Sequence, residues 1–139
     1  MSASGLGYFG DARRSAVGEE LLDRAVAGGT LVLRKLGGDR AGEMRYQRFL
    51  NATQVTPEEM LATAGDATAR VAEGRRVLAI QDTTEVSFGR KRQRPQELGP
   101  GTDDHSPALF VHPVLAVERD GDQSVLGPVH AEIWTRSGE

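Results

Sequence analysis

The sequence changes from a helical to a strand-like pattern at one short stretch near its middle. This stretch reads Val77-Leu78-Ala79-Ile80-Gln81-Asp82-Thr83-Thr84-Glu85. Four consecutive apolar residues, two of them β-branched, favour a short buried strand over a helix. Because polar residues follow at once, we expect Asp82 to lie at the carboxyl end of this strand.

The sequence before this strand has the spacing of amphipathic helices. Three main helices are expected, each after a favoured capping residue: from Asp11 to Gly28-Gly29, over 40–50 after Asp39, and from Thr56 to about Gly74. A short apolar piece, residues 31–36, lies between the first two. Thr56, Pro57 and Glu59 have the spacing of a capping box, in which the Thr and Glu side chains bind each other's backbone N–H groups.

The sequence after residue 85 predicts a long loop and two further strands. The loop covers residues 89–107, and the strands cover 109–117 and 125–134, joined by a turn at 120–123. Since proline cannot donate to a ladder, Pro113 and Pro128 are expected at edges, bulges or strand starts. Trp134 is either a core residue or a surface platform, and the core position is favoured for a single Trp in an apolar strand. The fold class is therefore α+β, or α/β, with helices first, a three-stranded antiparallel meander second, and a boundary near residue 74.

The composition is that of an ordinary globular chain. The 139 residues include no cysteine, 27% charged residues and 38% hydrophobic residues. Disulfide scaffolds, cysteine-ligated zinc sites and thiol nucleophiles are therefore excluded. No apolar run is long enough to cross a membrane, and the first residues lack the basic start and apolar centre of a signal peptide. We expect a cytoplasmic protein with no membrane partner.

Charge is unevenly distributed along the chain. The net charge is −3, but residues 1–94 carry 15 basic and 12 acidic side chains, net +3, whereas residues 95–139 carry 2 and 8, net −6. The basic residues cluster at 34–35, 40–48, 75–76 and 90–94, and 15 of the 17 are arginine. The planar guanidinium suits phosphate, but the codon usage of a GC-rich bacterial genome gives the same enrichment, and both explanations stay open.

Two groups of polar residues are candidates for chemistry. Asp82 follows four apolar residues and could hold a divalent cation at a sheet edge through its oxygens; a turn residue that caps the strand end is the alternative. A second cluster consists of Asp103, Asp104, His105 and His112. Its spacing matches no zinc-binding motif, so a polar loop and a strand-face histidine are favoured.

Several short motifs occur in a defined order between Phe9 and Arg136. They are Phe9-Gly10-Asp11-Ala12-Arg13-Arg14, Gly37-Gly38, Glu43-Met44-Arg45-Tyr46-Gln47-Arg48-Phe49-Leu50-Asn51, Val55-Thr56-Pro57-Glu58, the stretch at 77–85, Leu98-Gly99 with Val111-His112, and Leu126-Gly127 with Ile133-Trp134. In this order, the set resembles the N-terminal part of a bacterial insertion-sequence transposase. The family is the hairpin-forming, cut-and-paste DDE class, whose catalytic core is ribonuclease-H-like.

The resemblance implies two segments. Residues 9–74 would form a helical domain that binds double-stranded DNA at the transposon end, and residues 75–139 would form the first three strands of an incomplete ribonuclease-H-like catalytic domain. Asp82 matches the first acidic residue of the DDE triad, which binds the catalytic metal ions, Mg²⁺ or Mn²⁺. The basic positions that match DNA-contacting residues are Arg13, Arg14, Arg45 and Arg48. Arg45 and Arg48 are three residues apart, so they project from one helical face.

Two departures from the family pattern limit what the chain does alone. The family's second Asp and its Glu have no counterpart here, and Asp103-Asp104-His105-Ser106-Pro107 replaces a Gly-Arg-Gly element. We therefore predict a truncated, nucleoid-associated transposase fragment that binds transposon ends, contributes Asp82 and cannot cleave DNA alone. The alternatives are a regulator that occupies transposon ends or mixes with full-length transposase, a non-functional relic, and a small metal-dependent hydrolase that uses Asp82, Asp104 and His112.

Overall fold

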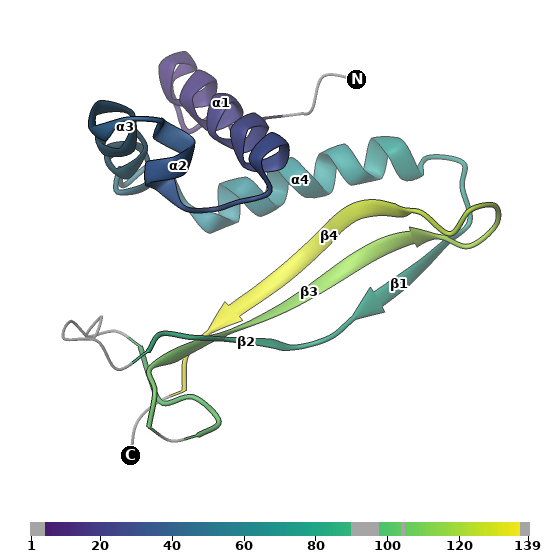
Figure 1. Ribbon diagram of the computed structural model, residues 1–139. Coiled ribbons are helices and arrows are strands. Elements are labelled where there is room, and N and C mark those ends of the chain that lie inside the picture. The colour runs from purple at the N-terminus through teal and green to yellow at the C-terminus, as the bar shows by residue number, and fades with distance from the viewer. Residues whose placement is uncertain (1–4, 90–97, 104, 137–139) are drawn as a thin grey trace. The chain divides into compact units, whose positions relative to one another are not determined.

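The computed structural model describes residues 5–89, 98–103 and 105–136 and confirms the α+β class, with helices first and an antiparallel sheet second (Figure 1). The helices are α1 (Ala12–Gly28), α2 (Leu33–Gly37), α3 (Arg40–Leu50) and α4 (Pro57–Ala72), and the strands are β1 (Val77–Gln81), β2 (Thr84–Ser87), β3 (Ala108–Glu118) and β4 (Val125–Trp134). The chain divides into two compact units, a helical unit (Met1–Ala67) and a sheet unit (Thr68–Glu139). The predicted boundary near residue 74 lies just past the end of α4.

Capping residues hold the helix ends that the sequence predicts. Asp11 accepts a hydrogen bond from the Arg13 N–H at 2.7 Å, and Gly29 ends α1 in the left-handed conformation, with φ of 56°. Asp39 accepts a hydrogen bond from the Gly42 N–H at 2.8 Å at the start of α3. Each side-chain cap satisfies an N–H group that a helix start leaves unpaired. Local sequence is therefore enough to set these boundaries.

The capping box expected before α4 is only half formed. The Thr56 hydroxyl accepts from the Glu59 N–H at 3.3 Å, as predicted. The Glu59 carboxylate instead accepts from the Tyr8 N–H at 3.1 Å. Glu59 therefore ties the segment before α1 to the start of α4, a long-range contact that the local motif does not encode.

The core of the helical unit is built mainly from α1, α2 and α3. Its buried residues are Phe9, Leu21, Leu36, Tyr46, Phe49 and Val55. The rings of Phe9 and Phe49 meet edge to face, with centroids 5.4 Å apart. A Cβ at Gly18 on α1 would lie 3.0 Å from the Phe49 ring and 3.3 Å from the Phe9 ring. The lack of a side chain at residue 18 therefore lets both rings press against α1.

The short helix α2 approaches α3 at a pair of glycines. A Cβ on Gly42 would collide with the Gly37 carbonyl, and a Cβ on Gly37 would collide with the backbone at Gly42. Gly38, between the two helices, has φ of 76°, a conformation that favours glycine. These glycines allow a tight turn to bring α2 against the start of α3.

The sheet contains four strands where the sequence predicts three. β4 pairs antiparallel with β3 along most of its length. β1 and β2 each pair antiparallel with residues of β3 that also pair with β4, so both occupy the opposite edge of β3 (Figure 1). The unpredicted strand β2 therefore continues β1 along the same edge of the central strand.

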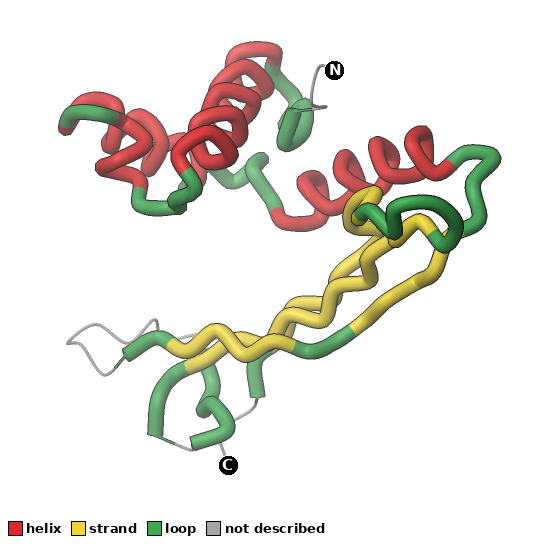
Figure 2. Tube along the Cα trace, turned by 45° about the vertical axis from the view of Figure 1, so that its right-hand side comes forward, coloured by secondary structure: helices red, strands yellow, loops and turns green. Residues whose placement is uncertain are grey.

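Asp82 and Thr83 form the interruption between β1 and β2. The two strands pair with β3 on either side of Pro113, and the break is visible between the two strand segments in Figure 2. Pro113 has no N–H to donate to the ladder, so pairing opposite it is weakened. Pro113 thus lies in the central strand, whereas the sequence predicted an edge, a bulge or a strand start. Asp82 lies at the break in the edge that β1 and β2 form together.

Pro128 lies in the outer strand β4, beside an irregularity in the pairing with β3, as its missing N–H requires. Its carbonyl accepts a hydrogen bond from the Thr68 hydroxyl at 2.7 Å. Thr68 is buried, and a Cβ at Gly127 would collide with its hydroxyl. This contact fixes the end of α4 to β4 within the sheet unit.

Two burial predictions for the sheet are wrong. Val77, Leu78 and Ile80 of β1 are 43%, 47% and 50% exposed. Trp134 is 40% exposed and stacks on Phe110, with ring centroids 5.7 Å apart. An apolar run identifies side chains that favour burial, but these side chains are buried only where another helix or sheet packs against the strand. The buried apolar residues of the sheet unit lie mainly on the central strand β3, not on its edges.

Replacement of Gly42 by alanine is expected to destabilise the helical unit. The added methyl group would collide with the Gly37 carbonyl and force α2 away from α3. This displacement should lower the free energy of unfolding by about 1–3 kcal/mol. The loss should outweigh the higher intrinsic helix propensity of alanine. Urea unfolding followed by circular dichroism measures the change. G28A is the matched control, because a Cβ at Gly28 would lie an ordinary 3.5 Å from Thr30. Equal stability of the two variants would contradict the close contact.

Candidate nucleic-acid interface

The four arginines predicted to contact DNA lie around one open depression on the helical unit. Arg13 and Arg14 come from the first turn of α1, and Arg45 and Arg48 come from α3. The arginine depression, as we call it, has a volume of about 400 Å³ and is lined by Arg13, Arg14, Val17, Arg45, Arg48, Phe49 and Ala52. The sequence places the two arginine pairs on separate helices, and the packing of α1 against α3 brings them together.

The arginine depression has a basic rim and an apolar floor. Val17 and Ala52 are half-buried and Phe49 is buried, whereas Arg13 and Arg48 are exposed. No acidic residue is among the lining residues. An anionic group that enters the depression would therefore meet guanidinium donors at the rim and carbon atoms below them.

Two of the four guanidinium groups are held by the protein. Arg14 donates from Nη1 to the Phe9 carbonyl at 3.1 Å, and Arg45 donates from Nη1 to Oε2 of Glu20 at 2.7 Å. Within the described residues, the side chains of Arg13 and Arg48 form no ion pair or hydrogen bond. The depression therefore combines two positioned guanidinium groups with two whose donors face solvent.

Glu20 on α1 is the centre of a polar network beside the arginine depression. Its Oε1 accepts from the Tyr46 hydroxyl at 2.8 Å and lies 3.1 Å from Arg24 Nη2. Arg24 also donates to the Leu36 carbonyl at 2.8 Å, which extends the network to α2. The Tyr46 hydrogen bond, followed by that of Arg45, lowers the pKa of the Glu20 carboxyl. Burial, and then the hydrogen bond to Glu20, raises the pKa of Tyr46.

Asp82 is exposed at the break between β1 and β2. Its Oδ1 accepts from the Thr83 N–H at 2.8 Å, and the Thr83 hydroxyl lies 2.8 Å from Nδ1 of His112. Among the residues that the structure describes, no three His, Asp or Glu side chains are grouped to hold a metal ion. Asp104 lies outside the described residues. Asp82 and its described neighbours therefore do not by themselves fit a Mg²⁺ or Mn²⁺ site.

Two carboxylates fix the loop before β3. Asp103 accepts from the N–H groups of Ser106 and His105 and from the Ser106 hydroxyl, and these bonds, the Ser106 N–H first, lower its pKa to about 2. Glu85 on β2 accepts from the Thr102 hydroxyl, the Ser87 hydroxyl and the Thr102 N–H, which lower its pKa. Both groups are engaged in shaping the loop.

The basic stretch predicted at 90–94 (Arg90, Lys91, Arg92 and Arg94) lies outside the described residues. Sequence reasoning also missed Glu20, the residue that holds Arg45. The one local signal for Glu20 is its i,i+4 spacing to Arg24, which pairs opposite charges on one helical face. That spacing does not reveal the contacts with Tyr46 and Arg45 on α3.

Comparisons with known proteins do not assign the chain to a family, because no family model and no curated protein matches it. In the described part of the chain, no helix is both long and apolar enough to cross a membrane.

The carboxyl group of Glu20 is expected to titrate below the 4.5 of an unperturbed glutamate. A carboxyl whose pKa is lowered by folding stabilises the folded state above the unfolded pKa, and this contribution is lost as the pH falls through the folded pKa. Y46F removes the largest cause of the shift and should move the midpoint back toward 4.5. Carbon-13 NMR of the side-chain carboxyl measures both midpoints, and an identical midpoint in the two proteins would refute the assigned cause.

Proposed function

We propose that the chain binds double-stranded DNA through the arginine depression, as the N-terminal segment of a DDE transposase that holds transposon ends. The convergence of Arg13, Arg14, Arg45 and Arg48 around one depression carries this proposal. Guanidinium groups donate hydrogen bonds in a planar fork that matches phosphate oxygens. A nucleic-acid strand presents phosphates in series, so it can engage several of these groups at once.

The apolar floor of the depression also suits a DNA strand. Val17, Phe49 and Ala52 offer carbon atoms against which the carbons of a deoxyribose can pack, while the phosphates on either side meet the arginine rim. The guanidinium groups of Arg14 and Arg45 are positioned by hydrogen bonds within the protein. Those of Arg13 and Arg48 form no hydrogen bond within the described residues, so all of their N–H donors can bind phosphate. Contacts of this kind set the position of the protein on the duplex without reading bases.

For the sheet unit, we propose that it belongs to a larger ribonuclease-H-like domain in which Asp82 is the first catalytic carboxylate. The exposed apolar side chains of Val77, Leu78 and Ile80 support this, because an apolar strand normally packs against a further layer. A Mg²⁺ or Mn²⁺ site would need ligands besides Asp82, so no cleavage step is assigned to this chain alone.

A second candidate function is regulation of transposition. In this alternative, the chain occupies transposon ends, or associates with full-length transposase, without cutting DNA. The observation that favours it is that the arginine depression is complete within the helical unit, whereas Asp82 lacks grouped acidic partners among the described residues. Both candidates require the same DNA-binding surface.

The double variant R13A/R48A is expected to bind the terminal inverted-repeat duplex about tenfold or more weakly than the wild type. Each phosphate contact contributes about −0.9 to the slope of log K against log salt, so the loss of two contacts should make this slope about two units shallower. Fluorescence anisotropy at several salt concentrations measures both quantities.

Arg70 provides the matched control for this prediction. It is exposed on α4 and does not line the depression, so R70A should leave the salt slope almost unchanged. Two outcomes would contradict the proposal. The first is a wild-type protein that shows no salt-dependent binding to DNA, and the second is an R13A/R48A protein with the same affinity and salt slope as the wild type.

A further inference from the structure

We propose that Glu20 is the positioning residue of the arginine depression, and that it makes DNA binding selective by holding Arg45 and offsetting its charge. This inference rests on the proposed DNA-binding function. Glu20 is not among the residues that line the depression. It therefore acts on bound DNA through Arg45.

Glu20 connects the depression to the core through its two carboxylate oxygens. Oε1 accepts from the hydroxyl of Tyr46, a core residue that is only 1% exposed. Oε2 accepts from Arg45 at 2.7 Å. Because the buried Tyr46 hydroxyl holds Oε1, the whole carboxylate is oriented, and Oε2 points toward Arg45. Arg45 is thus held by a group that is itself held in the core.

This arrangement leaves Arg45 able to bind phosphate. A guanidinium group carries five N–H donors, and the bond to Glu20 uses one of them. The Arg45 guanidinium also lies 5.7 Å from the centre of the Tyr46 ring, which further restricts its direction. A side chain that is ordered before binding loses less entropy when DNA arrives. The positions of the phosphates depend on the sequence-dependent shape of the duplex, so the gain is greatest for a duplex whose phosphates match the fixed donors.

The charge of Glu20 has the opposite effect on unmatched DNA. Its carboxylate pairs with both Arg45 and Arg24, and a glutamate is ionised at neutral pH. Non-specific binding to DNA depends almost entirely on positive charge, so a carboxylate beside the rim weakens it. Glu20 therefore favours matched duplexes in two ways, by ordering one donor and by reducing general attraction.

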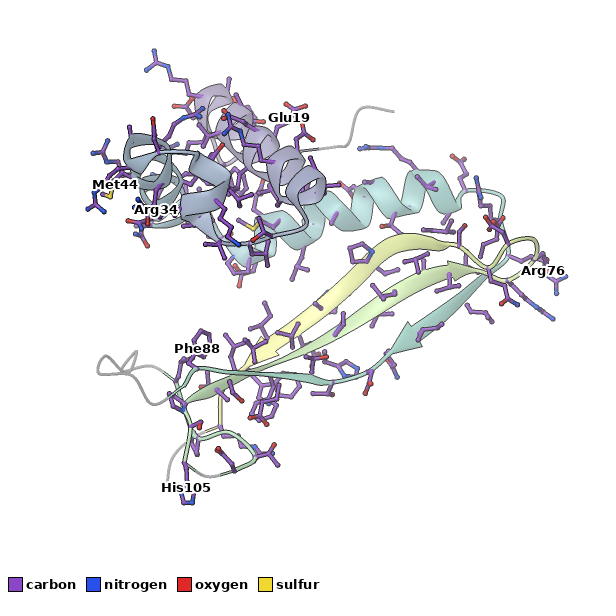
Figure 3. All side chains as sticks on the ribbon, viewed as in Figure 1. Glu19, Arg34, Met44, Arg76, Phe88 and His105 are labelled. Carbon is purple, nitrogen blue, oxygen red and sulfur yellow. The ribbon has the colours of Figure 1, made fainter. Side chains whose placement is uncertain are left out.

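The test compares E20Q with E19Q. The glutamine amide carries no charge and replaces one carboxylate oxygen with an NH2 donor group, so Tyr46 and Arg45 can no longer donate to two separate anionic oxygens, and any remaining bond to Arg45 loses its charge assistance. Glu19 is the neighbouring exposed residue on α1 (Figure 3). The two substitutions change the net charge equally, from −3 to −2, but only E20Q weakens the ion pair that holds Arg45.

Binding is measured with two fluorescent duplexes, one from the terminal inverted repeat that flanks the gene and one with the same bases in scrambled order. E20Q should bind the scrambled duplex more tightly than the wild type, and its preference for the repeat should fall about threefold or more. E19Q should keep the wild-type preference. An unchanged preference in E20Q, or an equal change in both variants, would overturn the role of Glu20.

R45K supplies a second variant in case E20Q folds poorly. Lysine keeps the charge but not the planar fork, so R45K should weaken binding to the repeat more than binding to the scrambled duplex and thereby lower the preference for the repeat. Unchanged preference in R45K overturns the inference as well. If the wild type binds neither duplex, the proposed function fails; if R13A/R48A weakens binding but E20Q behaves as E19Q does, only the role of Glu20 fails.

Discussion

The packing of α1 against α3 is the contact on which the helical unit and its basic surface depend. Phe9 and Phe49 meet edge to face over Gly18, where any side chain would crowd both rings. Beside this apolar contact, Glu20 joins α1 to Tyr46 on α3 through a hydrogen bond at the edge of the core. The arginine depression is formed by residues of α1 and α3 and of the segment just after α3. Its geometry therefore depends on the same contacts between the two helices that stabilise the core.

The sheet unit follows a different constraint, imposed by the central strand. Pro113 cannot donate to its neighbour, and the first edge of the sheet is interrupted at Asp82 and Thr83 opposite it. The interruption leaves Asp82 outside the ladder, and the residue is exposed. The apolar side chains of β1 are exposed on the same edge. Both features support the proposal that the sheet contributes one acidic group to a larger catalytic domain.

Local signals predicted more of this structure than long-range ones. The caps at Asp11 and Asp39 bind N–H groups within three residues, so the sequence is sufficient to predict them. β2 was missed because Thr84–Ser87 lacks an apolar pattern and is a strand only through pairing with β3. The four arginines were identified, but their convergence depends on helix packing that periodicity does not describe. The role of Glu20 was missed for the same reason, since its decisive partners lie on another helix.

NMR observation of the arginine side chains during titration with the terminal inverted-repeat duplex shows whether the four arginines of the depression bind DNA as one surface. The Nε–Hε signals of Arg13, Arg14, Arg45 and Arg48 should shift together, at the same DNA concentration, while the signal of Arg70 stays in place. Shifts confined to arginines of the sheet unit, or an absence of shifts in the four that surround the depression despite measurable binding, would contradict it.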